Sequence, residues 1–181
     1  GRELYIEQVD FMEEPPRKFF GLRPGGEVRL RFCFLIKCEE VVKDENGVVT
    51  ELRCSYDPET RSGSESVQRK VIGTIHWVSC EHAVTAEVRL YDRLFTVPKP
   101  DQDANGRDFK EFINPDSLQV LPDARLEPGL AENAGQPVQF ERTGYFVTDS
   151  EDSDPLKPVF NRIVTLRDSW AKIEKAQAGN V

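Results

Sequence analysis

Apolar and polar residues alternate from Glu27 onward, which predicts a strand with one buried and one exposed face. The apolar positions on one face are Val28, Leu30, Phe32 and Phe34. We expect this strand to continue to Val42. Arg29 and Arg31 lie two positions apart on its polar face, so about 7 Å separates them along the strand.

The dipeptide Asn46-Gly47 separates this strand from a second apolar run at residues 48–54. Both turn residues tolerate positive φ, and Asn-Gly between two such runs is a strong hairpin signal. The first two strands are therefore predicted to pair as a hairpin.

Short β-type segments continue to the end of the chain. They lie at residues 71–78, 86–91, 118–121, 138–140, 144–147 and 159–166. Residues 109–113 predict one short helix, and Leu166, Trp170 and Ile173 predict a terminal helix that packs on the rest. Many short strands with turn signals are typical of antiparallel barrels or sandwiches, so we expect an all-β (mainly β) fold.

The composition is that of a soluble globular protein, with 38% apolar and 31% charged residues among 181. A net charge of −8 argues against a nonspecific nucleic-acid binder. Residues 17–37, however, carry six basic residues and one acidic residue. A local basic stripe on an acidic protein suits docking of an anion at one place.

No motif for catalysis or metal binding stands out. The chain has no Gly-rich phosphate loop, no G-x-S-x-G elbow and no C-x-x-C pair, and Cys33 and Cys38 are predicted to lie on opposite faces of one strand. We therefore predict no catalytic residue and no metal here. Arginines near Phe19, Phe20 and Phe32 would suit unpaired RNA bases, but the pattern alone favours a solvated charged strand face.

Five segments read, in chain order, EVRLR from Glu27, GTIHWVS from Gly73, VRLYDRLF from Val88, QFERTGYF from Gln139 and KPVFNR from Lys157. Together they resemble the C-terminal anticodon-binding part of glutaminyl-tRNA synthetases. The resemblance is colinear over essentially the whole chain.

This resemblance implies two antiparallel β-barrels similar to the ribosomal protein L25 fold, which bind the anticodon loop between them. The first barrel would span residues 1–75 and be incomplete at its N-terminus. The second would span residues 76–175, with strand exchange near the C-terminus, and residues 176–181 would be a tail or linker. The chain lacks an initiator Met and the family's catalytic signatures, so we expect a fragment that follows a class I catalytic domain.

Site residues are also implied by the resemblance. Arg29 and Arg31 would serve the pocket for the first anticodon base. Gln139 would help to read the middle uracil, with Arg142 beside it and Lys18 near the same base.

One departure concerns the third base, a guanine. Phe20 and Gly21 stand where family members carry basic side chains. Arg17, Phe20 and Arg23 are the candidate contacts in their place.

The implied parent is a glutamine–tRNA ligase that uses ATP with magnesium, whereas this fragment would need no cofactor. Its expected partners are tRNA(Gln) and its own upstream catalytic domain, without DNA or a membrane, in a cytoplasmic monomer. Two alternatives remain. One is the equivalent region of an archaeal or eukaryotic-type glutamyl-tRNA synthetase, and the other is a nonenzymatic L25-like RNA-binding or protein-docking module.

Overall fold

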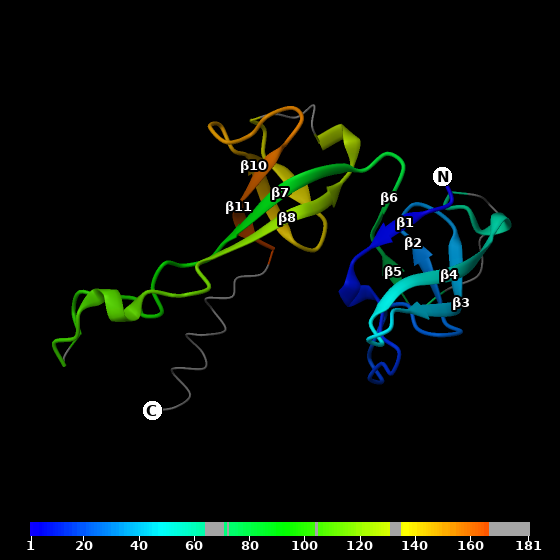
Figure 1. The fold of residues 1–181 in the computed structure, drawn as a ribbon, viewed down its shortest axis with the longest axis horizontal. Helices are drawn as coiled ribbons and strands as arrows, with labels where there is room; N and C mark the ends of the chain where they lie inside the picture. The colour runs from blue at the N-terminus through cyan, green and yellow to red at the C-terminus, as the bar shows by residue number, and fades with distance from the viewer. Residues whose placement is uncertain (64–70, 72, 104, 131–134, 167–181) are drawn as a thin grey trace. The chain divides into compact units, whose positions relative to one another are not determined.

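The computed structural model is mostly β, which confirms the expected fold class, and it divides into two compact units, Gly1–Glu81 and His82–Val181 (Figure 1). It describes residues 1–63, 71, 73–103, 105–130 and 135–166. In these ranges no helix is long and apolar enough to cross a membrane. Trp170 and Ile173 of the predicted terminal helix, and the tail at 176–181, lie outside the described residues. The predicted barrels and their boundaries stay predictions.

The first unit is built from a four-stranded and a two-stranded sheet (Figure 1). The larger sheet has the order β4-β3-β2-β5, with β2 at Glu27–Leu30, β3 at Leu35–Lys43, β4 at Val49–Asp57 and β5 at Thr74–Ile75. The smaller sheet pairs β1, Leu4–Ile6, antiparallel with β6, Trp77–Ser79. Short 3-10 helices lie at Gln8–Asp10 (η1) and Pro58–Thr60 (η2).

The alternation in β2 places its apolar residues in the core of this unit, as predicted. Val28 and Leu30 are buried together with Leu22, Ile36, Cys38 and Ile75. Full burial of an aliphatic side chain of this size contributes about 1.5–3 kcal/mol. Strand β2 pairs antiparallel with β3 and parallel with β5, so it is fixed on both edges.

The predicted Asn46-Gly47 hairpin is confirmed between β3 and β4. Gly47 has a φ of 81°, and its N–H donates to the carbonyl of Asp44 over 3.0 Å. The Asp44 carboxylate accepts the N–H groups of Asn46 and Val48 at 2.9 and 2.8 Å. The turn chemistry read from the sequence therefore sets the register of these strands.

The prediction of one continuous strand from Glu27 to Val42 is wrong. The chain reverses between β2 and β3 at residues 31–34, where the Cys33 N–H donates to the Leu30 carbonyl at 2.8 Å. Phe32 has a φ of 58° and does not share the buried face of β2. Arg31 and Cys33 also lie in this turn, so neither the arginine pair nor the Cys33–Cys38 pair occupies a single strand. All four cysteines are free thiols.

The second unit has one five-stranded sheet in the order β8-β7-β11-β10-β9 (Figure 1). Its strands are β7 at Val84–Tyr91, β8 at Leu118–Leu126, β9 at Val138–Phe140, β10 at Gly144–Thr148 and β11 at Val159–Thr165. Its buried core is Ala86, Val88, Phe146 and Phe160. Each predicted segment of this unit forms a strand, and β7 pairs parallel with β11.

The described part of this unit also contains two short 3-10 helices, η3 at Phe109–Phe112 and η4 at Pro128–Leu130. The first confirms the predicted short helix. Asp108 caps it by accepting the Lys110 N–H at 2.9 Å, and the Glu111 carboxylate accepts the Asp108 N–H at 3.2 Å. Strand β8 runs beyond its predicted end because Pro122 is tolerated on an edge strand.

Candidate nucleic-acid interface

The β2–β3 turn presents two exposed side chains, Arg31 and Phe32, from a fixed backbone. The Leu30 N–H donates to the Phe34 carbonyl at 3.0 Å, and the Arg31 N–H donates to the Ile75 carbonyl at 3.0 Å. The Trp77 indole N–H donates to the Arg31 carbonyl at 3.0 Å. The turn is therefore held by both sheets of the first unit, while the Arg31 guanidinium lies 4.8 Å from the centroid of the Phe32 ring.

The Arg29 side chain supports this turn through hydrogen bonds. Its Nη1 donates to the carbonyls of Cys33 at 3.0 Å and Thr60 at 2.8 Å. The Ser62 hydroxyl donates to the same Cys33 carbonyl at 2.9 Å. The half-buried guanidinium thus joins the β2–β3 turn to the end of η2. This structure therefore gives Arg29 a positioning role and leaves Arg31 at the surface.

Replacing Arg29 with alanine is expected to lower the free energy of unfolding by about 2 kcal/mol, because two part-buried backbone carbonyls lose hydrogen bonds to a charged donor. Urea denaturation measures the change. Arg31→Ala is the matched control and is expected to stay within about 0.5 kcal/mol of the parent, because its side chain is exposed. Equal losses in both variants would contradict the supporting role of Arg29.

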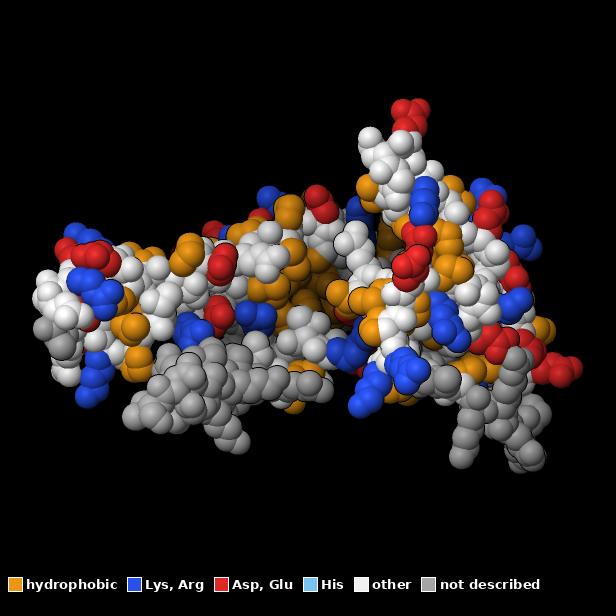
Figure 2. Space-filling model, turned by 90° about the horizontal axis from the view of Figure 1, so that it is seen from below, with side chains coloured by type: hydrophobic (Ala, Val, Ile, Leu, Met, Phe, Trp, Pro, Cys, Tyr) orange, Lys and Arg blue, Asp and Glu red, His pale blue; other side chains and the backbone are white. Residues whose placement is uncertain are grey.

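The remaining candidates of the first unit lie on the loop between η1 and β2. Arg17, Lys18, Phe20 and Arg23 are all exposed. The loop is anchored by hydrogen bonds from the Leu22 N–H to the Asp10 carbonyl at 2.7 Å and from the Met12 N–H to the Leu22 carbonyl at 3.1 Å. In Figure 2, the visible face of the first unit carries Lys and Arg side chains beside exposed apolar surface.

Glycines bring this loop against β2 and β5. A Cβ at Gly73 would overlap the Phe20 carbonyl oxygen, and a Cβ at Gly21 would overlap the Asp10 carbonyl and the Phe19 ring. The Gly73 carbonyl accepts the Arg29 N–H at 2.9 Å. The departure at Gly21 therefore has a structural reason, since the backbone here leaves no space for a side chain.

The second unit presents its candidates on the β9–β10 turn. Gln139 is exposed on the edge strand β9 and pairs with Tyr145 of β10. Arg142 is exposed with a φ of 62°, and the Thr143 N–H closes the turn on the Phe140 carbonyl at 3.0 Å. Among the described residues outside glycine, Phe32 and Arg142 alone have positive φ. Each occupies the third position of a hairpin turn.

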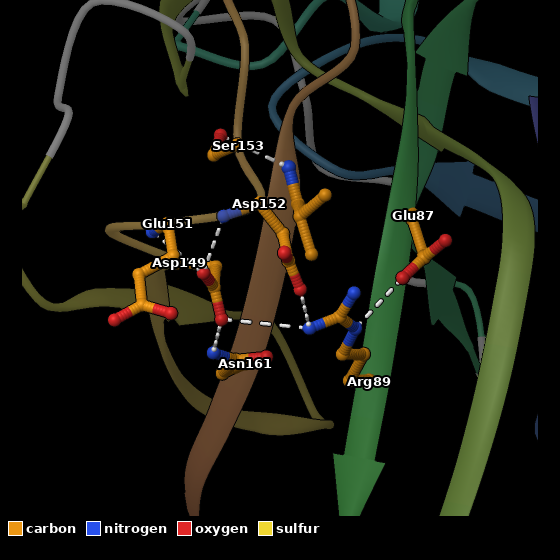
Figure 3. Close-up of polar contacts among 8 residues, drawn as sticks. Glu87, Arg89, Asp149, Glu151, Asp152, Ser153 and Asn161 are labelled. Carbon is orange, nitrogen blue, oxygen red and sulfur yellow. Dashed lines mark hydrogen bonds and ion pairs between the residues drawn. The ribbon is translucent and has the colours of Figure 1, made fainter.

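Sequence reasoning did not find the polar network around Arg89 on β7 (Figure 3). Its Nε donates to Glu87 at 2.7 Å, and its Nη1 donates to Asp152 at 2.6 Å. Asn161 of β11 donates to Asp149 at 2.6 Å. Asp149 and Asp152, in the loop after β10, are therefore folded back onto the β7–β11 pair, which supports a structural role for Arg89.

Acid is expected to destabilise the second unit through Asp149. The N–H of Asp152, the Asn161 amide and the N–H of Glu151 lower the pKa of Asp149 to about 2. An unfolded aspartate titrates near pH 4, so this contribution is complete above about pH 4 and is lost as the pH falls towards 2. Urea titrations across this range should give Asp149→Asn a shallower pH dependence than the parent. Identical slopes would contradict the assignment.

In the part of the chain that the structure describes, no group of three His, Cys, Asp or Glu side chains is placed to hold a metal ion.

Two family models match the chain, at residues 1–57 and 74–149, and both describe the anti-codon binding domain of class I tRNA synthetases (E and Q). The chain is 54% identical to a glutamine–tRNA ligase of Bradyrhizobium diazoefficiens over 95% of its length. It is 57% identical to the Rhodopirellula baltica enzyme of that name over 95% of its length, and 56% identical to the Pseudomonas putida one over 94%. It spans 28–30% of these relatives.

Proposed function

Because the chain belongs to the anticodon-binding domain family of class I tRNA synthetases for glutamate and glutamine, we propose that it recognises the anticodon of a glutamine tRNA. The observation that carries the proposal is the pair of hairpin turns that present Arg31 and Arg142. Each turn is closed by backbone hydrogen bonds and exposes a guanidinium. Guanidinium groups bind phosphates and base edges and stack on unpaired bases.

In this proposal Arg31 contacts the first anticodon base and Arg29 holds the turn that presents it. Gln139 and Arg142 contact the middle uracil, because their side chains are exposed on and beside a fixed turn. Lys18 lies on the exposed loop of the first unit and adds positive charge near the same base.

The third base would be read from the loop that carries Gly21. Arg17, Phe20 and Arg23 are exposed there, and Phe20 has 60% of its surface accessible. The close approach of Gly21 to Asp10 fixes the backbone of this loop. A flat ring or a guanidinium held in this way suits stacking on, or hydrogen bonding to, a guanine.

The parent protein, in this proposal, is a cytoplasmic, monomeric glutamine–tRNA ligase. Its catalytic domain lies outside this chain and uses ATP with magnesium to attach glutamine to the tRNA. The chain supplies recognition, and a base contacted here alters catalysis only through packed contacts with that domain. Its relatives of that name are more than three times its length, which supports a division of labour within one polypeptide.

The test is binding of isolated anticodon stem–loops at one fixed salt concentration, since phosphate contacts make every affinity salt-dependent. We expect the glutamine loop to bind roughly 5- to 150-fold more tightly than a glutamate loop, which differs at the third base. A preference for the glutamate loop would instead favour a glutamyl-type enzyme. Equal affinity for these and unrelated loops would reject anticodon recognition.

A further inference from the structure

Phe32 occupies a position that costs the fold stability. Its side chain is 83% exposed, although phenylalanine gains free energy from burial. Its φ of 58° lies in the left-handed region, which L residues with a Cβ adopt at a cost of about 1–2 kcal/mol. Asparagine or glycine would serve this turn better. The fold therefore gives no reason for a phenylalanine here.

The backbone around Phe32 is held firmly enough to maintain this conformation. The residues on either side are fixed through the Arg31 N–H and carbonyl, which bond to Ile75 and Trp77, and through the Cys33 carbonyl, which accepts from Arg29. An exposed ring on a fixed turn loses little conformational entropy when a ligand binds. Strain retained at an exposed and well-anchored position is typical of a binding site.

The Arg31 cation beside the ring, together with the basic stretch of sequence that contains Phe32, indicates an anionic partner with flat groups. The Arg31 guanidinium lies 4.8 Å from the ring centroid, within the range of a cation–π contact. Residues 17–37 carry six basic residues against one acidic residue. Unpaired nucleotides offer a flat base and a negative phosphate together, and a basic site with an exposed aromatic ring matches both.

We propose that Phe32 is a stacking platform for an unpaired base of a single-stranded RNA loop, with Arg31 beside it. This inference rests on the proposed anticodon recognition. It adds a contact that contributes to binding affinity and contributes little to discrimination between bases. Stacking is tolerant of sequence because every base has a flat face. Phe32 thus fixes where the loop lies, and Arg31 then contacts the first anticodon base.

The decisive variant is Phe32→Asn, because the fold and the binding site respond to it in opposite directions. Asparagine relieves the strain, so the midpoint of thermal unfolding should rise. Loss of stacking should weaken binding of the glutamine anticodon stem–loop by roughly 5- to 150-fold. Phe32→Leu should also lose affinity because leucine lacks a flat ring. Phe32→Tyr should keep the affinity of the parent because tyrosine retains the ring. A thermal midpoint that falls in Phe32→Asn would overturn the strain argument.

A fluorescent base identifies the stacked nucleotide. 2-Aminopurine placed at each loop position in turn should be quenched at one position by the parent chain, and the quenching should vanish with Phe32→Asn. If the parent binds the loop and Phe32→Asn binds it equally well, the platform is wrong while anticodon recognition stands. If the parent does not bind the stem–loop, anticodon recognition is rejected. Binding of oligouridine then tests the stacking platform by itself. A loss of oligouridine affinity in Phe32→Asn supports it, and no change overturns it.

Discussion

Replacing Gly73 with alanine is expected to lower the free energy of unfolding by about 3 kcal/mol or more, because the added methyl group overlaps a backbone oxygen. That oxygen belongs to Phe20, and neither backbone is free to move. The Gly73 carbonyl accepts the Arg29 N–H, and the loop of Phe20 is bonded to Asp10 through Leu22. The clash must therefore separate the loop between η1 and β2 from strands β2 and β5.

The matched control is Gly129→Ala. A Cβ at Gly129 has no atom within 4 Å, so the substitution should change stability by no more than about 0.5 kcal/mol. Chemical denaturation measures both variants, and stem–loop binding should fall only for Gly73→Ala. Equal stability of the two variants would show that the loop and the sheet are not packed as closely as described.

Replacing Phe146 with alanine is expected to cost about 3–5 kcal/mol, the usual range for a buried phenylalanine. Its side chain has no exposed surface, and its ring stacks on Phe140 at 4.1 Å between centroids. Phe140 also contacts Phe160 at 5.4 Å and begins the turn that carries Arg142. The cavity would therefore loosen the β9–β10 turn as well as the core of the second unit.

Tyr145→Ala serves as the control for this loss, because Tyr145 is the preceding residue on β10 and is 42% exposed. The cross-strand contacts of a partly exposed strand residue such as Tyr145 contribute about 1 kcal/mol or less. Thermal and urea unfolding should show a loss of unfolding free energy that is several-fold larger for Phe146→Ala than for Tyr145→Ala. Similar losses would mean that burial of Phe146 does not dominate the stability of this unit.

The elements that follow local rules could be predicted from the sequence. Alternation at Val28 and Leu30 identified the core face of β2, and Asn46-Gly47 identified the hairpin between β3 and β4. Both signals act over a few residues. The short helix predicted at residues 109–113, observed at 109–112, rests on a similarly local signal.

The β2–β3 turn could not be predicted because its sequence carries no turn residue. Arg31 to Phe34 contains no glycine, proline or asparagine, and the apolar alternation continues through it. The turn is imposed by tertiary contacts, including the bond from Arg29 to Thr60, which are 31 positions apart. The supporting role of Arg29 could not be predicted either, because a partner as distant in sequence as Thr60 leaves no local pattern.

The Arg89 network illustrates the same limit in the second unit. Arg89 and Asp152 lie 63 positions apart, and the parallel pairing of β7 with β11 brings the loop that carries Asp152 to β7. Acidic residues close together in a sequence, such as Asp149 and Asp152, are usually solvated, and nothing in this part of the sequence indicated a half-buried partner. The contact of Asp152 with β7 could be found only from the fold.

The most direct test of the central claim is a double-mutant cycle between Arg31→Ala and the first anticodon base. In the parent chain, substitution of this base in the glutamine stem–loop should cost about 1–3 kcal/mol of binding free energy. In Arg31→Ala the same substitution should cost much less, which gives a coupling energy of about 1 kcal/mol or more. Additive losses would contradict a contact between Arg31 and this base, and equal affinity for every loop would contradict anticodon recognition itself.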